Sequence, residues 1–523
     1  MNDMKQFISI ALSALLLVAL SGCDFNINNN PNEATKTKMT PDLLLPHIEH
    51  SMAAFTGASN TDWDSADGQR WYFHWLGCWA RSGQYGSNTD VESYVINGQF
   101  NQSVWNDLFR ILENVNSLET QAQERKNPGY EGIAKILKVY GFHILVDSYG
   151  DLPYSESFKG IMTPKHDKAE DIYTDMIKQL DAADKLLQQE INEDTDPKLA
   201  NVDKVFKGKA QMWRKFGNTL RLRLVLRMVN VKDQGALKAE VDKIVANGAG
   251  FLGAGEDVEA SFGYKNDNGK VSPFWVKYYK NHAGKAIDAY NRAGEYLLSK
   301  LNNGNDRRIE AIFRPVGDKW GNGYVGVQFG NDNGAYKAEH GPNATSMVSG
   351  PGLAKTYDQP AWIMPAFESL FLQAEAIQRG LLAGDAKSVY EAAVRDDFRW
   401  LEVGRFENPL SREGEDPQWA DETLDTIVSE YLSGRAGSWD NSSDKLELIL
   451  NQKYIALAGV NGYELWSDYR RTGIPTDIPK SVYPSASSNH IPNLLVYPPS
   501  EVANNKAHVV VKDPQRDKIF WAK

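Results

Sequence analysis

Few residues in this chain have the types and spacing that catalysis or metal binding requires. The sequence contains no HExxH, GxSxG, P-loop or CxxC motif, which are signatures of metalloproteases, serine hydrolases, nucleotide hydrolases and thiol redox proteins. His47 and His50 flank Glu49 on an expected helix, but two histidines without a third ligand are a weak metal site. The 68 Asp and Glu residues offer many carboxylate pairs of the kind that glycoside hydrolases use. Such a pair works only at a defined distance, and the sequence does not give that distance. We therefore predict no catalytic residue and no metal ligand.

A partial calcium pattern precedes a tryptophan-rich segment. Asp62, Asp64, Asp67 and Gly68 partly resemble the start of a calcium-binding loop. The glycine comes one position late, and the position that should supply a bidentate glutamate is Phe73. A calcium hand of that type is excluded, a looser structural calcium site is left open, and no other cofactor is expected.

Aromatic side chains in polar loops are the residues best suited to bind a ligand. A sugar has a face of C–H groups with hydroxyls around its rim, so it suits a flat aromatic ring flanked by amide, carboxylate or guanidinium groups. The chain has 14 Trp and 23 Tyr, and for each ring the alternative role is packing that anchors its loop. The candidate ligand-binding residues are Trp275, Tyr278, Tyr279, Trp320, Asn322, Tyr324 and Trp63.

Another group of tryptophans is expected to belong to the core. Trp71, Trp75 and Trp79 recur at helical spacing, which is typical of a buried face. Cys78 lies among them and is expected to be a small buried hydrophobic residue rather than a nucleophile.

The elements that must position the candidate rings are mostly helices. Met212, Phe216 and Leu220 recur every four residues while Arg221 falls elsewhere on the wheel, which predicts an amphipathic helix over 208–230. Comparable patterns predict helices over 104–123, 133–147, 169–187, 286–298, 365–379, 386–401 and 446–457. Several of them follow one another across short turns, so we predict a mostly α fold with a tetratricopeptide-like scaffold of helical hairpins.

Two segments have a different composition. Residues 248–285 and 302–362 are rich in Gly and Asn with interspersed aromatic residues, and they are expected to be long loops. Loops of that length in a folded domain are usually functional or disordered, and the aromatic content favours function. We predict that they form a loop-rich ligand-binding face.

The N-terminus has the pattern of a lipoprotein signal. Lys5 precedes an apolar stretch over 7–20, and Leu20-Ser21-Gly22-Cys23 follows it. The apolar stretch is shorter than the roughly 20 residues that span a bilayer, which indicates a cleaved signal rather than a membrane anchor. Acyl chains on Cys23 would instead hold the protein at the membrane. The expected segments are a signal peptide (1–22), a lipidated flexible tether (23–40) and a single large domain (41–523).

The charge of the chain argues against one class of partner. The formal net charge is −11 at pH 7, with 57 Lys and Arg against 68 Asp and Glu. A negative protein repels nucleic-acid phosphates, and no long run of basic residues opposes that effect. Nucleic acid is therefore not expected as a partner.

An ordered set of motifs accompanies the N-terminal signal. They are Asn30-Pro31-Asn32 with Thr40 to Pro46 (TPDLLLP), Asp147 to Glu156 (DSYGDLPYSE), Trp213 to Arg223 (WRKFGNTLRLR), Asn305 to Arg308 (NDRR), Glu368 to Glu375 (ESLFLQAE), Asn461 to Gly473 (NGYELWSDYRRTG) and the tail from Ile491-Pro492 to Glu501. With these motifs, nearly the whole chain after the signal resembles the SusD/RagB family of Bacteroidetes nutrient-binding outer-membrane lipoproteins, and in particular its SusD-like branch. Two positions depart from the family's usual residues: Asn493 stands where the family usually has Arg, and Gly217 where it usually has Ala.

The resemblance implies a function as well as a fold. It implies a cell-surface, lipid-anchored outer-membrane protein that captures oligosaccharides and delivers them to a SusC-like TonB-dependent transporter, with no enzymatic step. One alternative is a lipoprotein of the same fold that binds peptides or another nutrient. The other is a surface glycosidase.

The shared motifs are expected to be scaffold rather than ligand site. A buried charge is tolerated only when it is paired, which would explain the dense Arg and Asp residues of these motifs. Trp466 and Tyr469 are expected in the core. The charged residues expected in partly buried ion pairs are Asp147, Arg221, Arg223, Asp468 and Arg470.

Overall fold

Helices make up most of this protein. The computed structural model describes residues 39–57, 68–193, 197–320, 322–405 and 421–523. The earlier helices are α2 (Pro41–Thr56), α3 (Arg70–Trp75), α4 (Thr89–Ser93), α5 (Ser103–Arg125), α6 (Pro128–Tyr149), α7 (Ala169–Glu193), α8 (Leu199–Val202), α9 (Ala210–Arg227), the 3-10 turn η2 (Met228–Asn230) and α10 (Gln234–Ala246). The later ones are α11 (Pro273–Tyr278), α12 (Glu295–Asn303), α13 (Arg308–Ile312), η3 (Val316–Asp318), α14 (Gly334–Glu339), α15 (Ala366–Gln378), α16 (Ala386–Trp400), α17 (Asp421–Ser433), α18 (Lys445–Leu457), α19 (Gly462–Thr472), η5 (Pro484–Ala486) and α20 (Pro499–Asn504).

The strands are short and pair two by two. In the described part of the chain, each pair is antiparallel and joins segments that are separated by other elements. The pairs are β1 (Trp79–Arg81) with β5 (Asn291–Ala293), β2 (Leu152–Pro153) with β3 (His166–Asp167), and β4 (Val258–Ala260) with β6 (Ala361–Met364).

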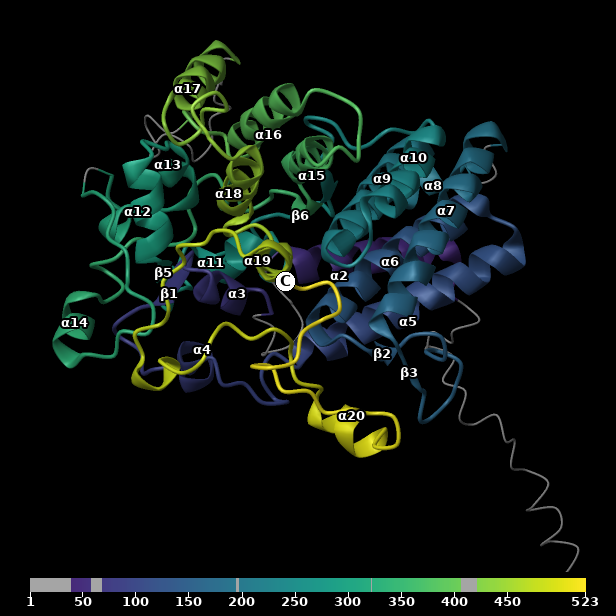
Figure 1. Ribbon diagram of the computed structural model, residues 1–523, viewed down its shortest axis with the longest axis horizontal. Helices are drawn as coiled ribbons and strands as arrows, with labels where there is room; N and C mark the ends of the chain where they lie inside the picture. Colours follow the sequence, from purple (N-terminus) through teal and green to yellow (C-terminus); the bar gives the residue numbers. More distant parts are fainter. Residues whose placement is uncertain (1–38, 58–67, 194–196, 321, 406–420) are drawn as a thin grey trace, which may run out of the picture. The chain divides into compact units, whose positions relative to one another are not determined.

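The long helices pack in series. Helix α6 contacts both α5 and α7, α7 contacts α9, and α9 contacts α10. A later group follows the same scheme, because α15 packs against α16 and α18, and α16 packs against α17. Figure 1 shows the first group in blue and teal and the later one in green. The predicted mostly α fold with a scaffold of helical hairpins is confirmed.

Helix α6 is the central helix of the first group, and its sequence explains how it fits there. Pro128 occupies its first turn, where the missing amide hydrogen has no helical partner to lose. A Cβ added at Gly132 would lie 2.7 Å from Leu187 of α7, and one added at Gly141 would lie 2.8 Å from Leu112 of α5. The two glycines therefore let α6 approach both neighbours more closely than any larger residue would allow.

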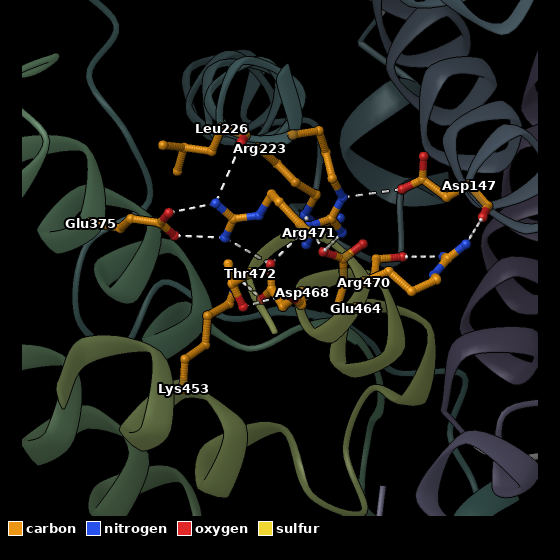
Figure 2. Close-up of polar contacts among 12 residues, drawn as sticks. Asp147, Arg223, Leu226, Glu375, Lys453, Glu464, Asp468, Arg470, Arg471 and Thr472 are labelled. Carbon is orange, nitrogen blue, oxygen red and sulfur yellow. Dashed lines mark hydrogen bonds and ion pairs between the residues drawn. The ribbon is translucent and has the colours of Figure 1, made fainter. Parts of the chain in front are cut away.

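A buried network of charged residues joins the two groups of helices (Figure 2). Arg227 of α9 contacts Glu464 at 2.5 Å and Asp468 at 2.8 Å, both on α19, and Asp147 of α6 at 3.2 Å. Burial alone raises the pKa of the Glu464 carboxyl, but the guanidinium groups of Arg223 and Arg227 outweigh it and hold that pKa well below its usual range. Glu464 is therefore ionised, and its charge depends on these partners.

The other ends of the network reach α15 and α18. Arg471 forms a bidentate pair with Glu375, with nitrogen–oxygen distances of 2.5 and 2.8 Å. Lys453 lies 2.8 Å from Asp468. The predicted ion pairs of Asp147 and Asp468 are thus confirmed, and so is that of Arg223, which contacts Glu368.

Of the remaining scaffold predictions, some are confirmed and others are wrong. Arg221 pairs with Glu240 of α10, as predicted. Arg470 does not form the expected ion pair. Its guanidinium donates to the backbone carbonyl of Asp147 at 2.7 Å (Figure 2) and to that of Asn493 at 2.8 Å. It also lies 3.4 Å from the ring centre of Trp466. Burial without a contacting carboxylate lowers the pKa of Arg470 to about 9. Trp466 is buried as predicted, whereas Tyr469 is only partly buried.

Most helix predictions agree with the structure to within a few residues, with one exception. The predicted helix over 286–298 is wrong, because residues 286–290 are loop, 291–293 form β5 and α12 begins only at Glu295. The predicted long loops over 248–285 and 302–362 hold only short elements. No helix among the described residues combines the length and apolar character needed to cross a membrane. The predicted signal peptide over 1–22 and Cys23 lie outside those residues.

Candidate functional site

A small backbone ladder brings together segments that are far apart in the sequence. Strand β1 pairs with β5 so that Ala80 lies opposite Arg292. Arg292 also forms a bridge with Met347, and Met347 forms one with Arg314. Residues from four parts of the chain therefore lie side by side.

Several loops leave this ladder, and backbone hydrogen bonds join three of them. We call these loops, together with α14, the loop face (residues 82–88, 281–290, 314–320, 322–324 and 330–345). The amide of Ser82 donates to the carbonyl of Tyr290 at 2.8 Å, and the amide of Gly83 donates to the carbonyl of His340 at 2.9 Å. The first loop is thereby joined to the second and to the end of α14.

Two tyrosines form an open aromatic pair on the loop face. The ring centres of Tyr85 and Tyr290 are 5.1 Å apart, and both side chains are partly exposed. The guanidinium carbon of Arg70 lies 5.1 Å from the Tyr290 ring centre and 3.9 Å from that of buried Trp71. In such an arrangement an exposed aromatic ring can stack on the face of a sugar, and the neighbouring guanidinium can donate hydrogen bonds to the hydroxyls of the same sugar.

The loop that carries Tyr290 is fixed by a side chain of its own. The Asp288 carboxylate accepts the amides of Tyr290 at 2.9 Å and Asn291 at 3.0 Å. A phenol is protonated at neutral pH at its ordinary pKa, and burial raises the pKa of Tyr290 further, to about 12, so its hydroxyl is available as a hydrogen-bond donor.

Arg81 fixes the loop that carries Tyr85. Its Nε donates to Glu92 at 2.6 Å, and its Nη1 donates to the carbonyl of Tyr85 at 2.6 Å. Its Nη2 lies 3.7 Å from the carboxylate of Asp332, which precedes α14. The loops that carry Tyr85 and Tyr290 are thus positioned before any ligand binds. Little conformational entropy is then lost when a ligand binds to them.

A second aromatic group lies at the third loop. The rings of Trp275 and Tyr279 meet edge to face with centres 4.7 Å apart, and the Arg314 guanidinium lies 4.0 Å from the Tyr279 ring centre. Asp318 lies 3.3 Å from Arg314 and accepts a 3.4 Å hydrogen bond from the Tyr279 hydroxyl. The structure therefore joins the predicted aromatic segment of α11 to the loop that carries Trp320.

The aromatic residues of helix α11, and Tyr279, which follows it, differ in exposure. Phe274 and Tyr278 are four residues apart and point inward, where the Tyr278 ring packs 5.1 Å from Trp79. The Tyr278 side chain is 1% exposed, so its predicted role as a ligand platform gives way to core packing. Trp275 stays partly exposed, whereas Tyr279 is also buried, with 6% of its surface exposed.

The remaining candidates lie on the loop that follows η3 or outside the described residues. Trp320 and Tyr324 are partly exposed, and Asn322 is exposed with its amide donating to the Val316 carbonyl at 3.2 Å. Trp63 lies outside the described residues. Ligand contact by Trp275, Tyr279, Trp320, Asn322, Tyr324 and Trp63 stays a prediction.

Reasoning from sequence missed Arg70, Tyr85 and Tyr290. Tyr290 fell in a segment predicted to be helical, and Tyr85 stands between two glycines in a loop that was not singled out. The composition Ser-Gly-Gln-Tyr-Gly-Ser, a tyrosine in a glycine-rich loop, was the available signal. The prediction that Trp71, Trp75 and Trp79 are core is confirmed, since all three are buried. Cys78 is buried too, and burial raises the pKa of its thiol to about 12, which is unlike a nucleophile.

The metal candidates have other roles in the structure. Glu49 is buried and accepts the amide of Lys204 at 2.8 Å, and His50 packs edge to face on Phe262. The described ranges hold no group of three or more His, Cys, Asp or Glu arranged to bind a metal. The aspartates of the partial calcium pattern lie outside them.

Comparisons with known proteins agree with this architecture. The sequence model of the SusD-like_2 family, described as "Starch-binding associating with outer membrane", matches residues 31–498. Among curated proteins no match is found.

Solved structures share the fold. A chitin-binding SusD homologue from Flavobacterium johnsoniae has a TM-score of 0.70 at 24% identity, covering 91% of this chain and 98% of its own. A SusD-like protein from Bacteroides thetaiotaomicron VPI-5482 has a TM-score of 0.69 at 24% identity, covering 92% and 98%. An outer-membrane protein from Bacteroides vulgatus ATCC 8482 has a TM-score of 0.71 at 21% identity, covering 92% and 100%. Since the family's sequence model spans most of the chain and its fold is that of SusD-like proteins, this protein belongs to the SusD-like_2 family.

Proposed function

We propose that this protein binds oligosaccharides at its loop face on the cell exterior and delivers them unaltered to a SusC-like TonB-dependent transporter. The observation that carries the proposal is the Tyr85–Tyr290 ring pair with Arg70 beside it. The family description, which names starch binding and the outer membrane, supports the ligand class and the location. A relative of the same fold is described as chitin-binding. The proposal needs no cofactor and no covalent step.

The physical chemistry of the site predicts modest affinity. Hydroxyl groups exchange hydrogen bonds to water for hydrogen bonds to protein, so the net gain per bond is small. Stacking contributes about 1 to 3 kcal/mol per ring by analogy with nucleic-acid bases. Dissociation constants between micromolar and millimolar follow for a short oligosaccharide.

Replacing Tyr290 by Ala is expected to weaken oligosaccharide binding at least tenfold. The change removes one ring of the pair, and tenfold corresponds to about 1.4 kcal/mol, which lies within the range for one stacked ring. Isothermal titration calorimetry with a panel that includes maltohexaose and chitohexaose measures the constant. Tyr290→Phe keeps the ring and should bind within about threefold of the wild type. Unchanged binding by Tyr290→Ala would remove the loop face as the site.

The same assays separate the two other candidate functions. Binding of peptides from a defined library with no binding to any glycan of the panel would favour a peptide-binding protein of this fold. Release of reducing sugar from maltohexaose or chitohexaose would indicate a glycosidase, and we expect none.

Membrane attachment is proposed to depend on Cys23. Replacing Cys23 by Ser in a Bacteroidetes host should move the protein from the membrane pellet to the soluble fraction, because the acyl chains have no other attachment point. Cys78→Ser is the matched control, since Cys78 is the only other cysteine of the chain and is buried. Retention of Cys23→Ser in the pellet after a high-salt wash would contradict a lipid anchor on this residue.

A further inference from the structure

A large cleft borders the loop face but has a lining of its own. It has a volume of about 1310 Å³, and its walls come from α12, α17, α18 and the segment 477–482. Figure 1 shows α12, α17 and α18 on one side of the molecule. Among the described residues, none that belongs to the loop face lines the cleft. Pockets for single small molecules usually measure roughly 300 to 1,000 Å³, so this one can accommodate an extended ligand.

One wall of the cleft presents a tyrosine ring that is held on two sides. Tyr296 of α12 packs against Gly77, where an added Cβ would lie 2.8 Å from the ring. The Tyr296 hydroxyl donates to Asp477 at 2.5 Å, and Lys300 Nζ donates to the same hydroxyl at 3.0 Å. The ring is partly exposed and lines the cleft. Because its position is fixed without a ligand, stacking on it carries little ordering cost.

The charges of the cleft are largely compensated. Lys300 lies 3.3 Å from Asp477, and Asp306 contacts the buried guanidinium of Arg308 at 2.6 Å. Carboxylates outnumber cationic side chains along the walls, which disfavours an anionic ligand. Neutral amide groups add donors and acceptors to the lining, among them those of Asn303, Gln328 and Asn451.

We infer that this cleft is a second carbohydrate-binding site, which takes a neutral oligosaccharide with one sugar ring stacked on Tyr296. The Lys300–Asp477 pair at the edge of that ring supplies a donor and an acceptor for the hydroxyls. The inference rests on the proposed function, because both take oligosaccharides as the ligand class. With two sites on one chain, a single polysaccharide can bind at both. Once it is bound at one site, its effective concentration at the other is high, which strengthens the overall binding.

Calorimetry on the full chain tests the cleft with maltohexaose and chitohexaose as probes. We expect the wild type to bind two molecules per chain, Tyr296→Ala to bind one, and the double variant of Tyr290→Ala with Tyr296→Ala to bind none. Tyr296→Phe, which keeps the ring, should retain the second molecule. Tyr357→Ala is the matched control, because Tyr357 is 41% exposed and lies outside the cleft lining.

The outcomes separate the two sites. If Tyr296→Ala binds like the wild type while Tyr290→Ala loses binding, the cleft is not a carbohydrate site and the loop face stands. If Tyr296→Ala abolishes binding while Tyr290→Ala does not, the cleft stands and the loop face falls. Absence of binding by the wild type to either probe overturns both.

Hydroxyl-radical footprinting of the wild type gives a second measurement that requires no variant to fold. Saturating maltohexaose or chitohexaose should lower the oxidation rate of Tyr296 at least twofold and leave that of Tyr357 unchanged. Equal oxidation of Tyr296 with and without a bound probe would overturn the inference.

Discussion

Replacing Arg227 by Met is expected to lower the free energy of unfolding by about 3 to 5 kcal/mol, which is the usual cost of removing one partner from a buried ion pair. The methionine leaves Glu464, Asp468 and Asp147 buried with one guanidinium fewer among them (Figure 2). Side-chain volume is largely kept, so the loss reports on charge rather than on a cavity. Chemical unfolding in urea, followed by circular dichroism, measures the change.

Lys238→Met is the matched control for this experiment. Lys238 pairs with Asp242 at 2.7 Å, but the two side chains are 52% and 60% exposed. Exposed pairs contribute little, and we expect a change within about 0.5 kcal/mol. A loss for Arg227→Met as small as that of the control would contradict the view that the network holds α6, α9 and α19 together.

Replacing Gly83 by Ala is expected to weaken oligosaccharide binding at least tenfold. A Cβ at this position would lie 2.1 Å from the backbone carbonyl oxygen of Lys337, so the first loop and α14 must move apart. That movement breaks the hydrogen bond from the Gly83 amide to His340 and displaces the segment that carries Tyr85. Calorimetry with the probes used for Tyr290 measures the effect.

A second glycine of the same loop provides the control. A Cβ at Gly86 meets no heavy atom within 4 Å, and neither glycine has a left-handed backbone conformation. Gly86→Ala should therefore bind like the wild type. Equal binding by the two variants would show that the packing of this loop on α14 does not position the site.

Local sequence patterns predicted the long helices because their apolar faces repeat within each helix. Helix α5 was predicted over 104–123 and spans Ser103–Arg125, and α18 was predicted over 446–457 and spans Lys445–Leu457. The predicted helix over 286–298 was wrong for one local and one tertiary reason. Asp288 accepts amides of its own turn, and residues 291–293 pair with β1, which is distant in the sequence. Strand pairing of that kind leaves no periodic signal in the segment itself.

The same distinction applies to the candidate sites. Composition identified Trp275 and the loop of Trp320, and the structure joins them through Tyr279, Arg314 and Asp318. It also distinguished Tyr278 from Trp275, since Tyr278 is buried against Trp79 while Trp275 stays partly exposed.

By itself the sequence determined the helical class, the family and the buried tryptophans, because these depend on residue type and on spacing within short segments. Only the tertiary structure decided which distant residues meet. Tyr85 lies beside Tyr290, and Tyr296 lies between Gly77 and Asp477. Such contacts form when strands pair and helices pack, and the free energy that selects them is shared among residues hundreds of positions apart.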